Sequence, residues 1–307
     1  MVQAHLDCRM DFVTDLRGEA RQWLPTLGYQ DADQLSDAEA LTLYLRIHHR
    51  IPQPRPRSFH RPAESLPTLS RKEKAGLAQL QREVEQGKPL RPRLSTTLLS
   101  RSADPLFNDW GVMHFHLGNR LQPDGFVKRT KHTAYAVVER DRFLLLAVLP
   151  HQPRPYEDTE LLRRWQANWP DSIARFQVDA KVDDGTREIS KDPALILAYR
   201  DKGYNVSTVV GGRTYLPMGG GVTVDGGAVD ALMEENRLTY EARWLQRDWQ
   251  AQFPGQSGRL RFGYQEFVVQ DSAGNLWHQQ AAGQAFSPVT GGLLRATHAI
   301  WIELGLS

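Results

Sequence analysis

Residues 108–121 read NDWGVMHFHLGNRL, and the alternation of polar and apolar side chains predicts a β-strand over residues 112–117. Because successive side chains of a strand point to opposite faces, His114 and His116 share one face and the apolar residues between them share the other. If the apolar face packs on a core, both imidazoles point to solvent or into a cleft. The stretch therefore predicts the first strand of a sheet and a candidate site.

Two further strands are predicted on the C-terminal side of this stretch, at residues 133–139 and 143–149, with a short polar turn between them. Residues 158–177 then carry apolar side chains at helical spacing, with a kink or new turn expected at Pro170. The central segment therefore predicts three antiparallel strands followed by a packed amphipathic helix.

The N-terminal segment predicts helices at residues 11–24, 37–49 and 69–86 from the spacing of their apolar side chains. Residues 51–67 contain five prolines interleaved with arginines, so they can neither continue a helix nor form a central strand. We expect an extended basic arm there, and residues 88–99 predict a second basic connection.

The C-terminal segment predicts a second unit that mixes helices and strands. Its predicted elements are a helix at 193–200, strands at 205–210 and 213–216 around Gly211-Gly212, a long helix at 228–252, a hairpin of 261–270 with 275–280, and a closing strand at 296–303. The fold class is therefore α+β, with N-terminal helices, a central antiparallel sheet with a packed helix, and a C-terminal α+β unit. The predicted domains are an N-terminal helical region with the basic arm (1–100), a central unit carrying the site (101–180) and the C-terminal unit (181–307).

The composition is that of a globular protein, with 40% hydrophobic and 24% charged residues. No apolar run approaches the roughly 20 residues needed to cross a bilayer, so no membrane association is expected. Residues 1–20 lack the continuous apolar stretch of a signal peptide, which favours a cytoplasmic location. Cys8 is the single cysteine, which excludes an intramolecular disulfide and a zinc site made of several thiolates.

The charge is unevenly distributed, although the net charge is only +2. Residues 46–93 contain nine Arg and three Lys against four Glu, a net charge of +8. Such a segment is compatible with an anionic partner, and RNA is the partner we consider first; solvated basic loops are the alternative. The candidate nucleic-acid-binding residues are Arg50, Arg55, Arg57, Arg61 and Lys131.

Imidazoles and cations are concentrated in and after the central stretch. The candidate catalytic residues are His114, His116, His132, His151, Lys128 and Arg129. One neutral imidazole can remove the proton of a ribose 2′-hydroxyl, a protonated group can donate to the leaving oxygen, and Lys or Arg can stabilise charge on phosphorus. Histidine can fill either role near neutral pH, and no metal or other cofactor is required.

Three other interpretations remain open at this point. Alternating histidines on a strand are often structural, half-buried residues. His114, His116 and His151 could instead bind a metal ion in a metallohydrolase, because His-x-His on a strand is good ligand geometry. The protein could also be a non-enzymatic module that binds nucleic acid or protein through the basic arm, insensitive to changes at the histidines.

Three parts of the chain carry a resemblance: DPLFNDWGVMHFHLG (104–118), LLLAVLPH (144–151) and RRWQANWPDSI (163–173). They resemble a group of uncharacterised bacterial proteins that share an NDWG, His-x-His-Leu-Gly, His and Asn-Trp-Pro pattern. The order of strands and helices is also similar, more remotely, to the compact ribonuclease toxins of the RelE and barnase-like kind. That analogy implies RNA cleavage without a metal, but those toxins are smaller and more basic than this chain.

The leading hypothesis from the sequence is a metal-independent ribonuclease, acting as a toxin or a phage-defence effector. Its candidate partners are RNA, a second copy of the chain, and an inhibitory protein. The hypothesis expects the four candidate histidines to converge within about 8 Å, the reach of acid and base groups around one phosphate.

Overall fold

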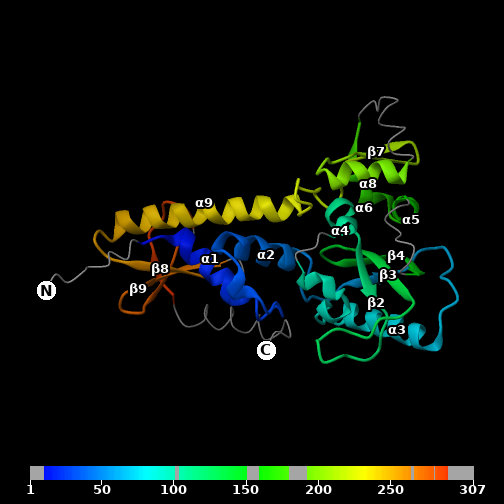
Figure 1. Cartoon of the computed structure of the whole chain (residues 1–307), viewed down its shortest axis with the longest axis horizontal. Helices are drawn as coiled ribbons and strands as arrows, with labels where there is room; N and C mark the ends of the chain where they lie inside the picture. Colours follow the sequence, from blue (N-terminus) through cyan, green and yellow to red (C-terminus); the bar gives the residue numbers. More distant parts are fainter. Residues whose placement is uncertain are drawn as a thin grey trace. The chain divides into compact units, whose positions relative to one another are not determined.

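The computed structural model describes residues 10–100, 104–150, 159–179, 192–263, 266–279 and 281–289. The fold class is α+β, as predicted, and the described residues form three sheets together with α- and 3₁₀-helices (Figure 1). None of the described helices is long and apolar enough to span a membrane.

The contacts within the chain group it into two units. Unit 1 comprises Met1–Ile47 and Met233–Ser307, and unit 2 comprises His48–Leu232. This grouping differs from the three consecutive regions expected from the sequence, because the first helices pack with the C-terminal strands and the basic arm packs with the central sheet.

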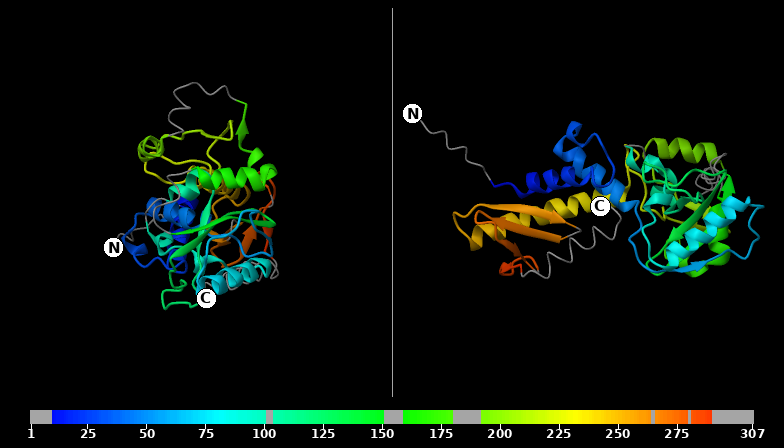
Figure 2. Two further views of the ribbon diagram at one scale, coloured as in Figure 1. Left: turned by 90° about the vertical axis from the view of Figure 1, so that its right-hand side faces the viewer. Right: turned by 90° about the horizontal axis from the view of Figure 1, so that it is seen from below.

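Unit 1 is built around a four-stranded sheet in the order β11-β10-β9-β8, with helix α1 on β8 and helix α9 along the sheet (Figure 1, Figure 2). The Leu260 amide donates to the Asp15 carboxylate at 2.8 Å, and Trp249 packs its ring against Trp277 and Phe286. Its elements are α1 (Phe12–Trp23), the 3₁₀-helix η1 (Ala32–Gln34), most of α2 (Asp37–His49), most of α9 (Val229–Gln252), β8 (Gly258–Gly263), β9 (Glu266–Asp271), β10 (Leu276–His278) and β11 (Ser287–Pro288).

Unit 2 is built around a sheet in the order β1-β4-β3-β2, with β1 parallel to β4 and the other pairs antiparallel. A smaller sheet has the order β5-β7-β6. The strands are β1 (Ser58–His60), β2 (Met113–His116), β3 (His132–Val138), β4 (Arg142–Pro150), β5 (Gln177–Val178), β6 (Thr208–Val210) and β7 (Arg213–Tyr215). The helices are α3 (Arg71–Glu85), η2 (Arg91–Arg93), η3 (Thr96–Leu99), α4 (Pro105–Trp110), α5 (Glu160–Asn168), α6 (Pro170–Ala174) and α8 (Pro193–Asp201).

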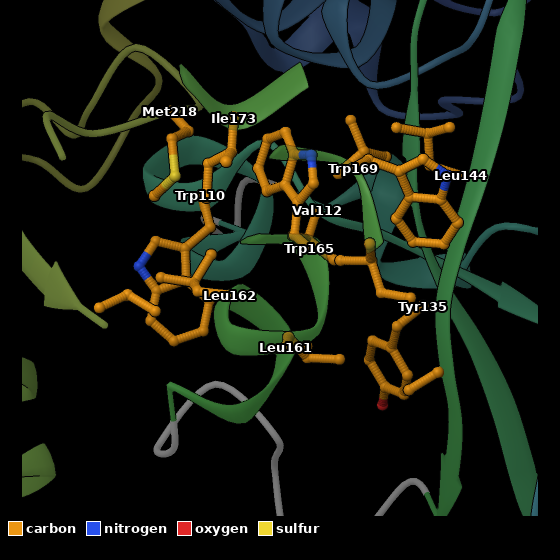
Figure 3. Close-up of a cluster of buried hydrophobic side chains, with 14 of the residues drawn as sticks. Trp110, Val112, Tyr135, Leu144, Leu161, Leu162, Trp165, Trp169, Ile173 and Met218 are labelled. Atoms are coloured by element: carbon orange, nitrogen blue, oxygen red, sulfur yellow. The ribbon is translucent and has the colours of Figure 1, made fainter. Parts of the chain in front are cut away.

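Helices cover both faces of the large sheet of unit 2. Helix α3 lies on one face, and α4, α5 and α6 lie on the other (Figure 1). Figure 3 shows the core on the second face, where Trp110 of α4 and Trp165 of α5 pack with Tyr135 of β3. Burial of both faces explains why β4 is a continuous run of apolar residues.

The predicted central strands and the turn at Gly211-Gly212 are confirmed, and one element differs from expectation. The helix predicted over 158–177 is divided into α5 and α6 at Pro170, as expected, because proline lacks the amide proton that a continuous helix requires. The strand predicted at 261–270 is divided between β8 and β9, which pair antiparallel. The predicted strand at 296–303 lies outside the described residues.

The proline-rich arm also contributes more structure than predicted. Three of its residues form β1, which pairs with β4 at the edge of the sheet. The ring of Phe59 stacks on that of Phe143 with their centroids 5.0 Å apart. A short strand between prolines is tolerated there because an edge strand needs partners on one side only.

Gly76 provides a direct test of the contact between α3 and the sheet. A Cβ at this position would lie 1.8 Å from the carbonyl oxygen of Leu117, whereas a Cβ at Gly18 of α1 would meet nothing within 4 Å. We expect Gly76→Ala to destabilise the fold by about 1–3 kcal/mol through overpacking. Gly18→Ala should stabilise it by about 0.5–1 kcal/mol, the usual effect within a helix. Urea unfolding measures both changes, and a stabilising Gly76→Ala would contradict the close packing of α3.

Candidate active site

Strand β2 presents two imidazoles side by side, as predicted. His114 lies opposite Tyr135 and His116 lies opposite Thr133 in the antiparallel pairing with β3. The ring centroids of the two histidines are 6.0 Å apart and their planes are nearly perpendicular, at 88°. Alternation along the strand therefore brings these two candidate residues together.

The two histidines differ in their access to solvent. His116 is buried, with 1% of its surface exposed, whereas His114 is half-buried. The sequence had led us to expect both rings on an open face. That expectation was wrong for His116, because α4, α5 and α6 cover the face that carries the imidazoles. Solvent can therefore reach His114, whereas His116 is enclosed in this conformation.

His114 lines a small pocket of about 10 Å³, room for about one water molecule, at the edge of the sheet. Because β2 is the edge strand of the sheet, the pocket is lined by side chains from both faces of that strand, Met113 and His114. The lining residues come from the turn after α2, the segment from the end of η2 through η3, the start of α4, and β2. They are Arg50, Leu94, Ser95, Leu98, Asp104, Phe107, Met113 and His114. The pocket thus combines an imidazole, a guanidinium, a carboxylate and a hydroxyl on apolar walls.

Arg50 is held in the pocket by Asp104. A guanidinium nitrogen of Arg50 lies 3.1 Å from the Asp104 carboxylate, and both side chains are largely buried. Asp104 also caps α4, because its other carboxylate oxygen accepts from the Phe107 amide at 3.2 Å. Arg50 was predicted from the sequence as a nucleic-acid-binding residue and His114 as a catalytic one. The structure places the two in the same pocket.

Tyr135 is a neighbour of the site that the sequence did not indicate. Its ring centroid is 6.3 Å from that of His114. Burial, reinforced by the negative charge of Asp104, raises the pKa of Tyr135 to about 12. The phenol therefore stays protonated at neutral pH. A tyrosine in an apolar strand usually belongs to the core, so no pattern in the sequence distinguished it.

Arg93 fixes the end of β2 from the side of α3. Its buried guanidinium pairs with Glu83 and donates to the carbonyl oxygens of His116, at 3.1 Å, and Gly118, at 3.3 Å. Charge-assisted hydrogen bonds of this kind hold a backbone firmly. Arg93 thus orients the segment that carries the two histidines.

His132 does not join His114 and His116, contrary to expectation. It precedes Thr133, the partner of His116, so its side chain projects from the opposite face of the sheet. There its Nδ1 lies 2.9 Å from a carboxylate oxygen of Glu73, and its amide donates to the same oxygen at 3.0 Å. His132 therefore joins β3 to the first turn of α3. The fourth candidate histidine, His151, lies outside the described residues.

The predicted cations of the β2–β3 connection are exposed. Lys128, Arg129 and Lys131 all lie on the surface. Arg129 donates to the Thr96 hydroxyl at 3.0 Å, and Thr96 follows Ser95 of the pocket wall. Among these three cations, Arg129 is therefore connected to the pocket wall, through its hydrogen bond to Thr96.

The arginines of the basic arm have different roles. Arg57 is buried and donates to the carbonyl oxygens of Glu139, Gln53 and Arg55 at 2.8, 3.0 and 3.2 Å. These bonds use the guanidinium to hold the arm on the sheet, so the structure gives Arg57 a structural role in place of the predicted contact with nucleic acid. Arg61 is exposed and donates to Gln81, and Arg55 is half-buried.

Metal ligands are not grouped within the described part of the chain. No three His, Cys, Asp or Glu side chains among those residues lie close enough to hold a metal ion. The set proposed for a metallohydrolase, His114, His116 and His151, includes a residue outside the described ranges.

We compared the chain with protein-family models, with curated proteins and with solved structures, and none of them matches it. The assignment of function therefore depends on the geometry of the pocket.

The carboxylate of Glu73 predicts an acid-dependent contribution to stability. Burial opposes its ionisation, but hydrogen bonds from Ser70 and His132 outweigh burial and lower the pKa of Glu73 from 4.5 to about 2. A depressed folded-state pKa stabilises the protein above about pH 4.5, and this stabilisation is lost as the pH falls toward 2. Between about pH 5 and pH 3, the wild type should lose on the order of 2 kcal/mol more unfolding free energy than Glu73→Gln.

Urea unfolding at the two pH values measures this difference. Glu85→Gln is the matched control, because Glu85 is exposed near the other end of α3. It should retain the acid sensitivity of the wild type. Equal acid sensitivity of Glu73→Gln and wild type would contradict the strength of the bonds between Glu73, Ser70 and His132.

Proposed function

We propose that the protein is a metal-independent ribonuclease that binds a substrate phosphate in the pocket lined by His114 and Arg50. One observation carries this proposal: a half-buried imidazole and a guanidinium line a single small pocket. An imidazole supplies acid and base chemistry near neutral pH, and a guanidinium is well suited to the charge of a phosphate.

The proposed reaction assigns a separate task to each of these side chains. Neutral His114 removes the proton from a ribose 2′-hydroxyl, and the 2′-oxygen attacks the adjacent phosphorus. The bond from phosphorus to the 5′-oxygen breaks, and that oxygen takes a proton from water. Arg50 stabilises the negative charge that develops on the phosphoryl oxygens. The products are a 2′,3′-cyclic phosphate and a 5′-hydroxyl.

His116 has a positioning role in this proposal. It is buried beside His114 and does not line the pocket, so we assign it no contact with the substrate. Its ring packs edge to face with that of His114 and restricts the orientation of the reacting imidazole. An activity that cleaves cellular RNA would suit a toxin or a phage-defence effector, and we propose such a role for the protein.

The test is RNA cleavage by the purified protein in the presence of a metal chelator. We expect the wild type to cleave single-stranded RNA under these conditions. His114→Ala should lower the rate by about 10²–10⁴-fold, the usual contribution of a general acid or base. A gel assay with labelled RNA measures the rates, and circular dichroism verifies that the variant is folded.

His60→Ala is the matched control. His60 lies on β1, the opposite edge strand of the same sheet, and its ring contacts the Ser58 hydroxyl. This variant should cleave at the wild-type rate. A wild type that binds RNA without cleaving it would favour the non-enzymatic binding module. Cleavage that requires one divalent metal would favour the metallohydrolase.

A further inference from the structure

The first turn of α3 carries three exposed cations, Arg71, Lys72 and Lys74. The N-terminus of a helix has a partial positive charge and is stabilised by acidic residues, so cations are unfavourable there. The single acid of the turn, Glu73, points inward as part of the capping box with Ser70. Local stability alone therefore does not account for this arrangement of charges.

A fourth cation joins this turn from a different part of the chain. The hydrogen bonds between Glu73 and His132 hold the start of β3 against α3, which places the exposed Lys131 beside the turn. We name Arg71, Lys72, Lys74 and Lys131 the α3 cation cluster. With Glu73 included, the local charge is 4 − 1 = +3.

The charges of the cluster are not neutralised by ion pairs in the part of the chain that the structure describes. Within the described ranges of the chain, no carboxylate forms an ion pair with any of its four members, and Glu73 is occupied by bonds from Ser70 and His132. Like charges on adjacent turns of a helix repel one another, which adds to the unfavourable effect of the helix dipole. A polyanion bound across the cluster would relieve both effects.

The cluster is connected to the pocket through the β2–β3 connection. Arg129 lies two residues before Lys131, and its guanidinium donates to Thr96 beside the pocket residue Ser95. The β2–β3 connection therefore carries one cation beside the pocket wall, Arg129, and one beside the first turn of α3, Lys131. Such a series suits an extended polyanion better than a small anion, which would contact one end of it.

We propose that the α3 cation cluster binds the phosphate backbone of single-stranded RNA as it leaves the pocket at His114. This inference rests on the proposed ribonuclease function and identifies the surface that holds the rest of the substrate. Lysine and arginine contacts to phosphates are independent of base sequence and release counterions, so the cluster contributes salt-sensitive affinity.

The test measures binding separately from cleavage. The probe is a fluorescently labelled single-stranded RNA with 2′-O-methyl groups throughout, which lacks the nucleophile needed for cleavage. Anisotropy at several salt concentrations gives the slope of log K against log salt. For Lys72→Gln with Lys74→Gln, we expect weaker binding and a slope shallower by about 1.4, since each phosphate contact on a single strand contributes about 0.7.

The matched control is Lys88→Gln with Lys202→Gln, which removes two exposed lysines outside the cluster. It should bind with the wild-type slope. If the cluster and control variants bind alike, or if the wild type does not bind the probe, the cluster proposal is overturned. If the wild type binds through the cluster but leaves unmodified RNA intact, the cluster proposal stands and the ribonuclease proposal fails.

Discussion

The antiparallel register between β2 and β3 determines where every candidate residue of the central sheet points. His116 opposite Thr133 and His114 opposite Tyr135 place these side chains on the face covered by α4, α5 and α6. Because side chains alternate along a strand, the same register directs His132 to the face covered by α3. A shift of one residue would exchange these roles, and the buried core on each face opposes such a shift.

Because both faces of the central sheet are buried, its histidines have different environments. His132 is occupied by Glu73 and holds α3 in place, and His116 is enclosed beside the core. His114 lies on the same edge strand, but it is half-buried and lines the pocket. The turn after α2 brings Arg50 into this pocket, and Asp104 holds it there. The chemistry of the proposed site therefore depends on one imidazole rather than on four.

Local patterns were sufficient to predict much of the fold. Alternation identified β2, and runs of apolar and β-branched residues identified β3 and β4. The spacing of apolar residues identified α1, α2, α3, α8, α9 and the segment that forms α5 and α6, but it did not indicate the short helix α4. The same patterns could not show that the sheet is covered on both sides, because alternation in β2 is equally compatible with one solvent-facing surface. They also could not distinguish Arg57, whose bonds to backbone carbonyls hold the arm, from Arg61, which lies on the surface. The meeting of Arg50 with His114 depends on packing between distant segments, for which a single sequence gives no signal.

The chemical nature of the cleaved ends tests the central claim most directly. RNA treated with the protein in the presence of a chelator can be analysed by mass spectrometry for its terminal groups. Attack by the 2′-oxygen predicts fragments ending in a 2′,3′-cyclic phosphate and beginning with a 5′-hydroxyl. Fragments with a 3′-hydroxyl and a 5′-phosphate, which result from attack by water, would contradict the role assigned to His114.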